Sequence, residues 1–459
     1  MTKNLHQNRL GNEPVIPLLF KLAIPSIISM FIQALYNVVD SIFVARISSK
    51  ALAALSLAFP IQMILISIAV GTGVGASSII SRLLGQGKDR RASITAEHVL
   101  LIGILYGIII GMIGAFFSKQ IIGFFTNDSE LIDMGSQYIK TIMMGSTALF
   151  IPMVCNSILR GEGNTFVPML TMLIGSVLNI ILDPLLIFGY GFFPELGIKG
   201  AAIATVLSRV ISGSFIIIML FKDKHQIRLD FSRFHFDISI VRGIFQVGLP
   251  AMTMQLLASF MMGGFNVLLS SYSTTAIAVM GIYFRLQSFV FMPVFGLSQG
   301  YMPILGYNYG HQNPARMKET MRYTFILSFI FTTLGFLLFQ LFPGQLIRMF
   351  SSNPELLTMG EDALRKISLA FPAIGPSIVG ATTFQSLGRG FPSLMLSLAR
   401  QIIFLFPLAM ILMKLGGLSF VWYAFPMAEF LSLIFMFIWL KHSMPIIYNQ
   451  LEKKNVSLG

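Results

Sequence analysis

The stretch AIPSIISMFIQALYNVVDSIFVAR, residues 23–46, decides the class of the fold. It belongs to an apolar run that opens near Ile16, and a helix needs only about 20 such residues to cross the hydrocarbon of a bilayer. The run is too long for a signal-peptide core and has no small-residue cleavage site, so we expect it to be retained. Of the 459 residues, 55% are hydrophobic and 11% are charged, whereas about 25% of a soluble domain is charged. The sequence therefore predicts an integral membrane protein.

The rest of the chain continues in apolar blocks of similar length. Measured against the length of a spanning helix, these blocks predict twelve transmembrane helices in an all-α polytopic membrane protein. The predicted spans are 16–45, 52–81, 94–118, 134–158, 165–190, 197–221, 240–270, 276–305, 319–342, 359–384, 391–414 and 418–440.

The opening stretch has a counterpart later in the chain. AIPSIISMFIQ matches GLPAMTMQLLA from Gly248, which aligns Pro25 with Pro250, and loop motifs recur at the same offset. Six spans in each half give the halves a parallel topology, related by an axis along the membrane normal. We therefore expect two six-helix lobes around a central cleft that opens alternately to each side. The expected parts are an amino-terminal lobe (1–220), a linker (221–239), a carboxy-terminal lobe (240–441) and a tail (442–459).

The formal net charge of +13 has a membrane explanation. With the amino terminus inside, the inside loops carry roughly twice as many lysines and arginines as the outside loops, as the positive-inside rule requires. This asymmetry predicts that both termini, the linker and the tail are cytoplasmic. Because it also accounts for the basic excess, nucleic acid is not an expected partner.

A polar stripe follows one face of the first span. Ser29, Gln33, Tyr36, Asn37 and Asp40 recur at spacings of three and four residues on an otherwise lipid-compatible helix. A charged side chain at the centre of a bilayer costs roughly 2.5 to 3.5 kcal/mol on insertion scales, so it faces a partner or a cavity. Polar amides alone would hold a bundle together, whereas a carboxylate adds a titratable group. Asp40 is therefore a candidate functional acid.

The fifth span carries a second acid. Asn179 and Asp183 are four residues apart and share a helix face, with Ser176 one turn further back. Pro184 has no N–H for the carbonyl of Ile180, so it frees an acceptor beside Asp183. Carboxylates, an amide and a free carbonyl suit a proton or a small hard cation. A proline kink with Asp183 satisfied by its neighbours is the structural alternative.

Other polar residues within the spans give weaker signals. Asn156 follows Pro152 in the fourth span, and LRGEGNT from Leu159 has the composition of a turn that ends a helix. We therefore interpret that motif as a tight connection. For four further charged groups we expect a place near an interface or pairing with one another, and a role in transport is the alternative. They are Arg209, Arg285, Arg400 and Glu429.

Several other functions are excluded. A single cysteine, Cys155, rules out an internal disulfide and a cysteine-based metal cage. GTGVGASS from Gly71 lacks the Lys-Ser/Thr of a P-loop, and helix packing through small residues explains it better. No His-rich metal spacing or nucleophile-base pair occurs, so we expect neither an enzyme nor a cofactor.

Several motifs together resemble those of a known transporter family. YNVVDSIFVAR, GQGK, LRGEGNT, NIILDPLLIFG and GIKGAAIATVLS occur in this order over the first half of the chain. Together with the duplication, they resemble the multidrug and toxic compound extrusion (MATE) family, and within it the bacterial MepA-type branch. The resemblance implies twelve helices in two lobes that form a V-shaped cleft. It also implies export of drug-like, often cationic and aromatic, compounds from the bacterial cytoplasm across the inner membrane, in exchange for protons or sodium ions.

The resemblance also implies a cation site. By motif, Asp40, Asn179 and Asp183 match the amino-lobe cation site of related transporters, with Asn156 a neighbour and Thr205 a further member. Some family members carry an acid eight residues after the proline that matches Pro250, where this chain has Ala258. A carboxy-lobe sodium site is therefore not expected, and coupling rests on the amino lobe. Proton coupling is favoured over sodium at Asp40, Asp183 and Asn179.

The remaining polar residues are candidates for lining the cleft: Gln33, Tyr36, Asn37, Ser176, Arg285 and Glu429. No obligate protein partner is expected besides the bilayer and a small-molecule substrate. Two alternatives stay open. A lipid-linked saccharide flippase would need a more cationic cleft, and a non-transporting membrane binding protein would bind substrate without moving it.

Overall fold

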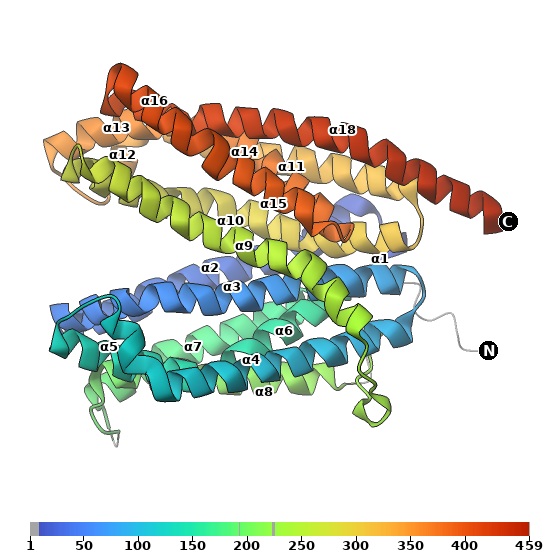
Figure 1. The fold of residues 1–459 in the computed structure, drawn as a ribbon, viewed down its shortest axis with the longest axis horizontal. Coiled ribbons are helices and arrows are strands. Elements are labelled where there is room, and N and C mark those ends of the chain that lie inside the picture. The colour runs from blue at the N-terminus through green and yellow to red at the C-terminus, as the bar shows by residue number, and fades with distance from the viewer. Residues whose placement is uncertain (1–8, 192, 223–224, 459) are drawn as a thin grey trace. The chain divides into compact units, whose positions relative to one another are not determined.

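Helices form nearly the whole chain in the computed structural model, which describes residues 9–191, 193–222 and 225–458 (Figure 1). No β-strand occurs in these residues, which confirms the predicted all-α class. The helices of the first half are α1 (Arg9–Asn12), α2 (Val15–Ile47), α3 (Ser49–Gly85), α4 (Asp89–Gly123), α5 (Ser129–Met144), α6 (Thr147–Gly161), α7 (Phe166–Phe188) and α8 (Gly197–Leu220). After a short 3-10 turn η1 (Phe231–Arg233) follow α9 (Ile238–Ser270), α10 (Thr274–Gly310), α11 (Pro314–Leu341), α12 (Pro343–Arg348), α13 (Pro354–Ser368), α14 (Phe371–Ser386), α15 (Gly390–Leu398), the π-helix η2 (Ala399–Leu405), α16 (Phe406–Gly416), α17 (Leu418–Val421) and α18 (Ala424–Leu458).

The number of spans agrees with the sequence prediction. Ten helices or continuous helical runs of the described chain are long and apolar enough to cross a membrane. Two further pairs pass the same test together but bend at a short break, by 47° between α5 and α6 and by 49° between α13 and α14. Gly145 and Ser146 interrupt the first pair, and Pro372 stands near the start of α14 in the second. Glycine and proline favour such breaks, and each pair counted as one span gives twelve.

The chain divides into two compact units. The amino unit comprises residues 28–248, and the carboxy unit comprises residues 1–27 and 249–459. These boundaries differ from the expected lobes, because the first part of α2 belongs to the carboxy unit and the first part of α9 to the amino unit. In both helices the change of unit falls within two residues of the aligned prolines, Pro25 and Pro250.

Close backbone contacts explain why these helix starts pack as they do. In the carboxy unit, a Cβ added at Gly296 would lie 2.4 Å from Cγ1 and 2.8 Å from the backbone N of Ile27. In the amino unit, a Cβ at Gly75 would lie 2.2 Å from the carbonyl oxygen of Ile244. Contacts this close exist only because glycine has no side chain. The sequence pattern of one helix does not show which other helix packs against its glycines.

The expected tail is also part of the fold. Residues 442–458 continue α18, and Met444, Ile447 and Leu451 are buried. The Tyr448 hydroxyl donates to Sδ of Met321 (3.4 Å), and Nζ of Lys318 lies 4.7 Å from the Tyr448 ring centroid. These contacts attach the end of α18 to α11. Residues 1–8 and 459 of the expected lobe and tail lie outside the described residues.

Candidate functional site

Two acids within the predicted spans of the amino unit, Asp40 and Asp183, lie close together although they belong to different helices. The Asp40 side chain of α2 lies within hydrogen-bonding reach of Asp183 on α7. Asp183 is fully buried and Asp40 is half-buried. Two ionised carboxylates this close repel each other, and one shared proton lets them form a hydrogen bond instead. The structure thus pairs the two acids that the sequence identified on separate spans.

An antiparallel pair of helices holds the amide and the hydroxyl of the site. Asn179 Nδ2 donates to Oδ1 of Asp183 (3.2 Å) and to Oγ1 of Thr205 on α8 (3.3 Å). The two helices pack tightly because a Cβ at Gly200 would lie only 2.2 Å from the carbonyl oxygen of Leu186. Tyr36 of α2 lies within hydrogen-bonding reach of Thr205. The packing of α7 on α8 therefore fixes the positions of Asn179, Asp183 and Thr205 relative to one another.

Several oxygen atoms of this group have no donor. Oδ1 of Asp40, Oδ2 of Asp183 and Oδ1 of Asn179 are buried without a hydrogen-bond partner. A buried acceptor that lacks a donor costs about 1 to 3 kcal/mol, and more when it is charged. Such oxygens suit a proton or a hard cation, whereas the described residues contain no group of three or more His, Cys, Asp or Glu that would hold a metal ion. Chemically, this arrangement of acceptors can bind a small positive charge.

Arg209 brings a fixed positive charge to the same place. It follows Thr205 by four residues on α8, so the two side chains share a helix face. Arg209 interacts electrostatically with both Asp40 and Tyr36. The sequence indicated Arg209 only as one of four unassigned charged residues. The four-residue spacing from Thr205 is the sequence feature that could have indicated Arg209 as a site residue. It does so only when Thr205 is known to lie beside Asn179.

The site has a further neighbour that the sequence did not indicate. Tyr138 of α5 is buried, accepts a hydrogen bond from Nε2 of Gln62 (3.1 Å) and interacts electrostatically with Asp40, Tyr36 and Arg209. Neither Tyr138 nor Gln62 belongs to a polar stripe, so no sequence pattern separates them from ordinary buried polar residues.

The other predicted site residues have varied environments. Gln33 and Asn37 are exposed on α2, and Ser176 is buried one turn before Asn179. Asn156 lies on α6 with a buried Oδ1 that has no hydrogen-bond partner. Two candidates belong to the carboxy unit: Arg285 is exposed on α10, and Glu429 is buried on α18.

The linker is bound to the amino unit by buried polar side chains. Ser93 Oγ and Glu97 Oε1 of α4 accept the backbone N–H groups of Arg228 and Asp230, each at 3.0 Å. Ser93 and Glu97 are four residues apart on a helix, a rise of about 6 Å, and Arg228 and Asp230 are two residues apart in extended chain, about 6.6 Å. The two acceptors are therefore spaced like the two N–H groups that they bind. Further along, Nε2 of His98 accepts the N–H of Asp237 (2.9 Å) while its Nδ1 donates to Ile94 (2.8 Å).

The LRGEGNT motif does more than end a helix. The turn itself is as expected, with Gly163 at φ 86°, where glycine is favoured. The partly buried Glu162 carboxylate, however, accepts the N–H of Gln226 and lies 3.1 Å from Nδ1 of His225. A glutamate within a glycine turn gave no indication of a partner more than sixty residues away.

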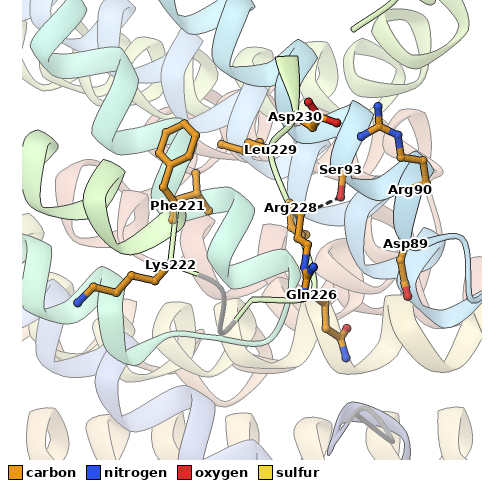
Figure 2. Close-up of a pocket in the computed structure, with 11 residues that line it drawn as sticks. Asp89, Arg90, Ser93, Phe221, Lys222, Gln226, Arg228, Leu229 and Asp230 are labelled. Atoms are coloured by element: carbon orange, nitrogen blue, oxygen red, sulfur yellow. Dashed lines mark hydrogen bonds between the residues drawn. The ribbon is translucent and has the colours of Figure 1, made fainter. Parts of the chain in front are cut away.

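A cavity of about 460 Å³ lies between the linker and the start of α4 (Figure 2). Figure 2 shows Lys222, Arg90 and Arg228 at its border with their charged ends pointing in different directions. They do not converge on one ligand, and Asp89 and Asp230 also line the cavity. We therefore assign the cavity to the attachment of the linker.

The attachment of the linker should depend on pH. The hydrogen bond to Glu162 raises the pKa of His225. A raised pKa stabilises the contact fully below the unfolded value of about 6.5, and this stabilisation is lost as the pH rises through the folded-state value. We expect backbone amide exchange at residues 226–230, corrected for intrinsic rates, to be slower at acidic than at alkaline pH. Glu162→Gln should flatten this dependence, and the exposed-site control Glu452→Gln should keep it. An equal pH dependence in all three proteins would contradict the assignment.

Comparisons with known proteins agree with this geometry. The family model described as MatE matches residues 25–185 and 250–411, and the two segments start at the aligned prolines, which confirms the duplication. The FAD transporter of Shewanella oneidensis is 29% identical over 426 residues, which cover 91% of this chain and 92% of that protein. The multidrug export protein MepA of Staphylococcus aureus is 26% identical over 418 residues, which cover 91% of each protein.

A solved structure gives the same result. The crystal structure of MATE in the straight conformation has a TM-score of 0.90 and 27% sequence identity, and the match covers 96% of this chain and 98% of that chain. These relatives are transporters, as expected for a chain predicted not to be an enzyme. On the strength of the two matched segments, the chain belongs to the MatE family, the multidrug and toxic compound extrusion transporters.

Proposed function

We propose that this protein exports drug-like small molecules by alternating access, in exchange for protons that bind at Asp40 and Asp183. The observation that carries the proposal is the pairing of these two acids on different helices, with oxygens that lack a donor. Proton binding removes the repulsion within the pair, so it changes how α2 packs against α7. A pair on two helices is thus suited to couple protonation to a change of conformation.

The small number of acceptors at the site favours a proton over sodium. Asp40 and Asp183 carry two negative charges when ionised and Arg209 carries one positive charge, so a single monovalent cation of either kind brings the group to neutrality. A hard metal cation needs a shell of about six or more oxygens, whereas a proton needs one acceptor. Arg209 thus compensates one of the two carboxylate charges, which a bound metal ion would have to compensate if the arginine were absent.

The substrate class follows from the same charges. An ionised acid pair attracts a cationic substrate, and protonation weakens that attraction, so substrate and proton bind in competition. MepA is named as a multidrug exporter, which supports a small-molecule substrate. We also propose that both termini and the linker are cytoplasmic, from the distribution of basic residues, and that the protein acts without an obligate protein partner.

The FAD transporter relative favours a second substrate class. FAD is aromatic but carries a negatively charged pyrophosphate, and Arg209 offers one cationic group beside the aromatic Tyr36. Competition of FAD with an aromatic monocation for binding would separate the two classes: a cation exporter binds the monocation and is insensitive to FAD.

Reconstituted vesicles test the coupling ion. We expect an imposed pH gradient to drive accumulation of ethidium, an aromatic monocation, and a sodium gradient at equal pH to drive none. Arg209→Met should make transport respond to sodium, because the site then lacks its fixed positive charge. The exposed-site control Arg348→Met should behave like the unaltered protein. Sodium-driven accumulation by the unaltered protein would contradict proton coupling, and binding without accumulation under either gradient would contradict transport.

A further inference from the structure

A second buried acid lies in the carboxy unit with its charge incompletely compensated. Glu429 on α18 is 5% exposed, and its Oε1 is buried with no hydrogen-bond partner. Among the described residues, the ion pair that reaches it is with Arg400, whose Nη1 lies 3.7 Å from Oε2. This distance exceeds that of a charge-assisted hydrogen bond, about 2.7 to 2.9 Å. A buried carboxylate oxygen that lacks a donor costs free energy, so the charge of Glu429 is incompletely compensated.

The partner of Glu429 sits on unusual backbone. Arg400 belongs to η2, a seven-residue π-helix between α15 and α16, and Figure 1 shows these two helices alongside α18. Pro407 is the second residue after η2, and a proline removes an N–H and crowds the carbonyl four residues earlier, which a wider turn relieves. π-turns within spans are frequent at functional sites. Gln401, next to Arg400, adds a buried Oε1 without a donor.

The surroundings of the pair are aromatic and apolar. Tyr283 of α10 is 1% exposed and interacts electrostatically with both Glu429 and Arg400. Its ring centroid lies 5.8 Å from that of Phe425, one turn before Glu429, and 6.5 Å from that of Phe371. Of the titratable and charged groups on the elements around α18, Arg400 and Tyr283 are the ones that the structure places in interaction with Glu429.

The same position in the amino unit also carries a charge. A glycine with positive φ opens the last span of the amino unit, Gly197 (53°), and another directly precedes the last span of the carboxy unit, Gly417 (67°). Arg209 stands twelve residues after Gly197, and Glu429 stands twelve residues after Gly417. The duplicated fold thus places a charge at equivalent positions, positive beside the acid pair in one unit and negative in the other.

We propose that Glu429 is a second proton-binding site, with Arg400 as the counter-ion that is released when the proton binds. A proton from water adds to the carboxylate oxygen that lacks a donor, and the ion pair becomes a neutral acid and a free guanidinium. Arg400 tolerates this because its side chain is 30% exposed and so remains partly hydrated. The proposal rests on the proposed function, since it assumes that protons drive transport. With a proton also bound in the amino unit, each cycle exchanges two protons for one substrate.

The stoichiometry distinguishes this proposal from a structural ion pair. Exchange of two protons for one monovalent cation moves one net charge, whereas exchange of one proton moves none. At equal pH, an imposed potential of 100 mV should then change the accumulation of ethidium by about 50-fold in the unaltered protein. In Glu429→Gln the potential should have no effect, while a pH gradient still drives accumulation. The exposed-site control Glu319→Gln should retain both responses.

The double variant Glu429→Gln/Arg400→Gln covers the case in which the single variant fails to fold. It leaves no buried charge unpaired, so it should keep the melting temperature and still lose the response to potential. A response to potential in either Glu429 variant would overturn the proposal. If the unaltered protein fails to respond to a pH gradient, the proposed function itself is wrong, and the two failures are therefore distinguishable.

Discussion

Asp40→Asn is expected to abolish accumulation driven by a pH gradient. Each coupled proton is worth about 1.4 kcal/mol, or a tenfold accumulation ratio, per pH unit. The variant should give a ratio near one, because without the acid pair substrate and proton no longer compete and no proton is coupled to transport. Asparagine has nearly the same shape as aspartate but carries no exchangeable acidic proton, and its amide would donate permanently to Asp183. The measurement is ethidium accumulation in vesicles at a fixed pH gradient.

The matched control for this prediction is Asp133→Asn. Asp133 is an acid on α5 of the same unit; its carboxylate accepts a hydrogen bond from Gln137, and its backbone carbonyl accepts one from Ser136. This control should accumulate substrate like the unaltered protein. Accumulation by Asp40→Asn at the same ratio would remove Asp40 from the mechanism.

Gly200→Ala is expected to cost stability and coupling together. The added Cβ would lie 2.2 Å from the oxygen and 2.6 Å from the carbon of the Leu186 carbonyl, and backbone atoms cannot rotate away. Forcing extra atoms into a packed site typically costs about 1 to 3 kcal/mol. Because α7 and α8 would separate, the contact of Asn179 with Thr205 should lengthen and proton-driven accumulation should fall. A melting curve of the purified protein checks the stability, and the vesicle assay checks the coupling.

A second glycine provides the control for this prediction. Gly281 also lies within a helix, but no atom stands within 4 Å of a Cβ placed there. Gly281→Ala should leave melting unchanged or raise it slightly, since alanine is favoured over glycine in a helix by about 0.5 to 1 kcal/mol. Equal melting temperatures for the two variants would show that the contact between Gly200 and Leu186 is not tight.

The sequence predicts the spans well, because apolar length is a property of one segment. Asp40, Asn179 and Asp183 are detectable for a similar reason, since polar groups spaced by three or four residues stand out in apolar helices. Thr205 came only from the family resemblance, and the structure places it beside Asn179. These features all lie within one helix or one motif.

The features that the sequence does not reveal depend on packing between helices. The first part of α2 belongs to the carboxy unit and the first part of α9 to the amino unit. This arrangement depends on glycine contacts such as that of Gly296 with Ile27. The attachment of the linker depends on Glu162, which lies in an ordinary turn motif. The π-helix at Arg400 cannot be recognised from the composition of its span, which is as apolar as that of an ordinary spanning helix. Periodicity cannot show such features, because each is defined by a partner elsewhere in the chain.

The most direct test of the central claim is to count protons when substrate binds. Purified protein in weakly buffered detergent solution, at a pH where it is protonated, receives ethidium while an indicator dye reports released protons. If the paired acids bind proton and substrate in competition, Asp40→Asn should release about one proton fewer per bound ethidium than the unaltered protein. The same release by both proteins, at equal ethidium binding, would contradict the claim that Asp40 and Asp183 carry the coupled proton.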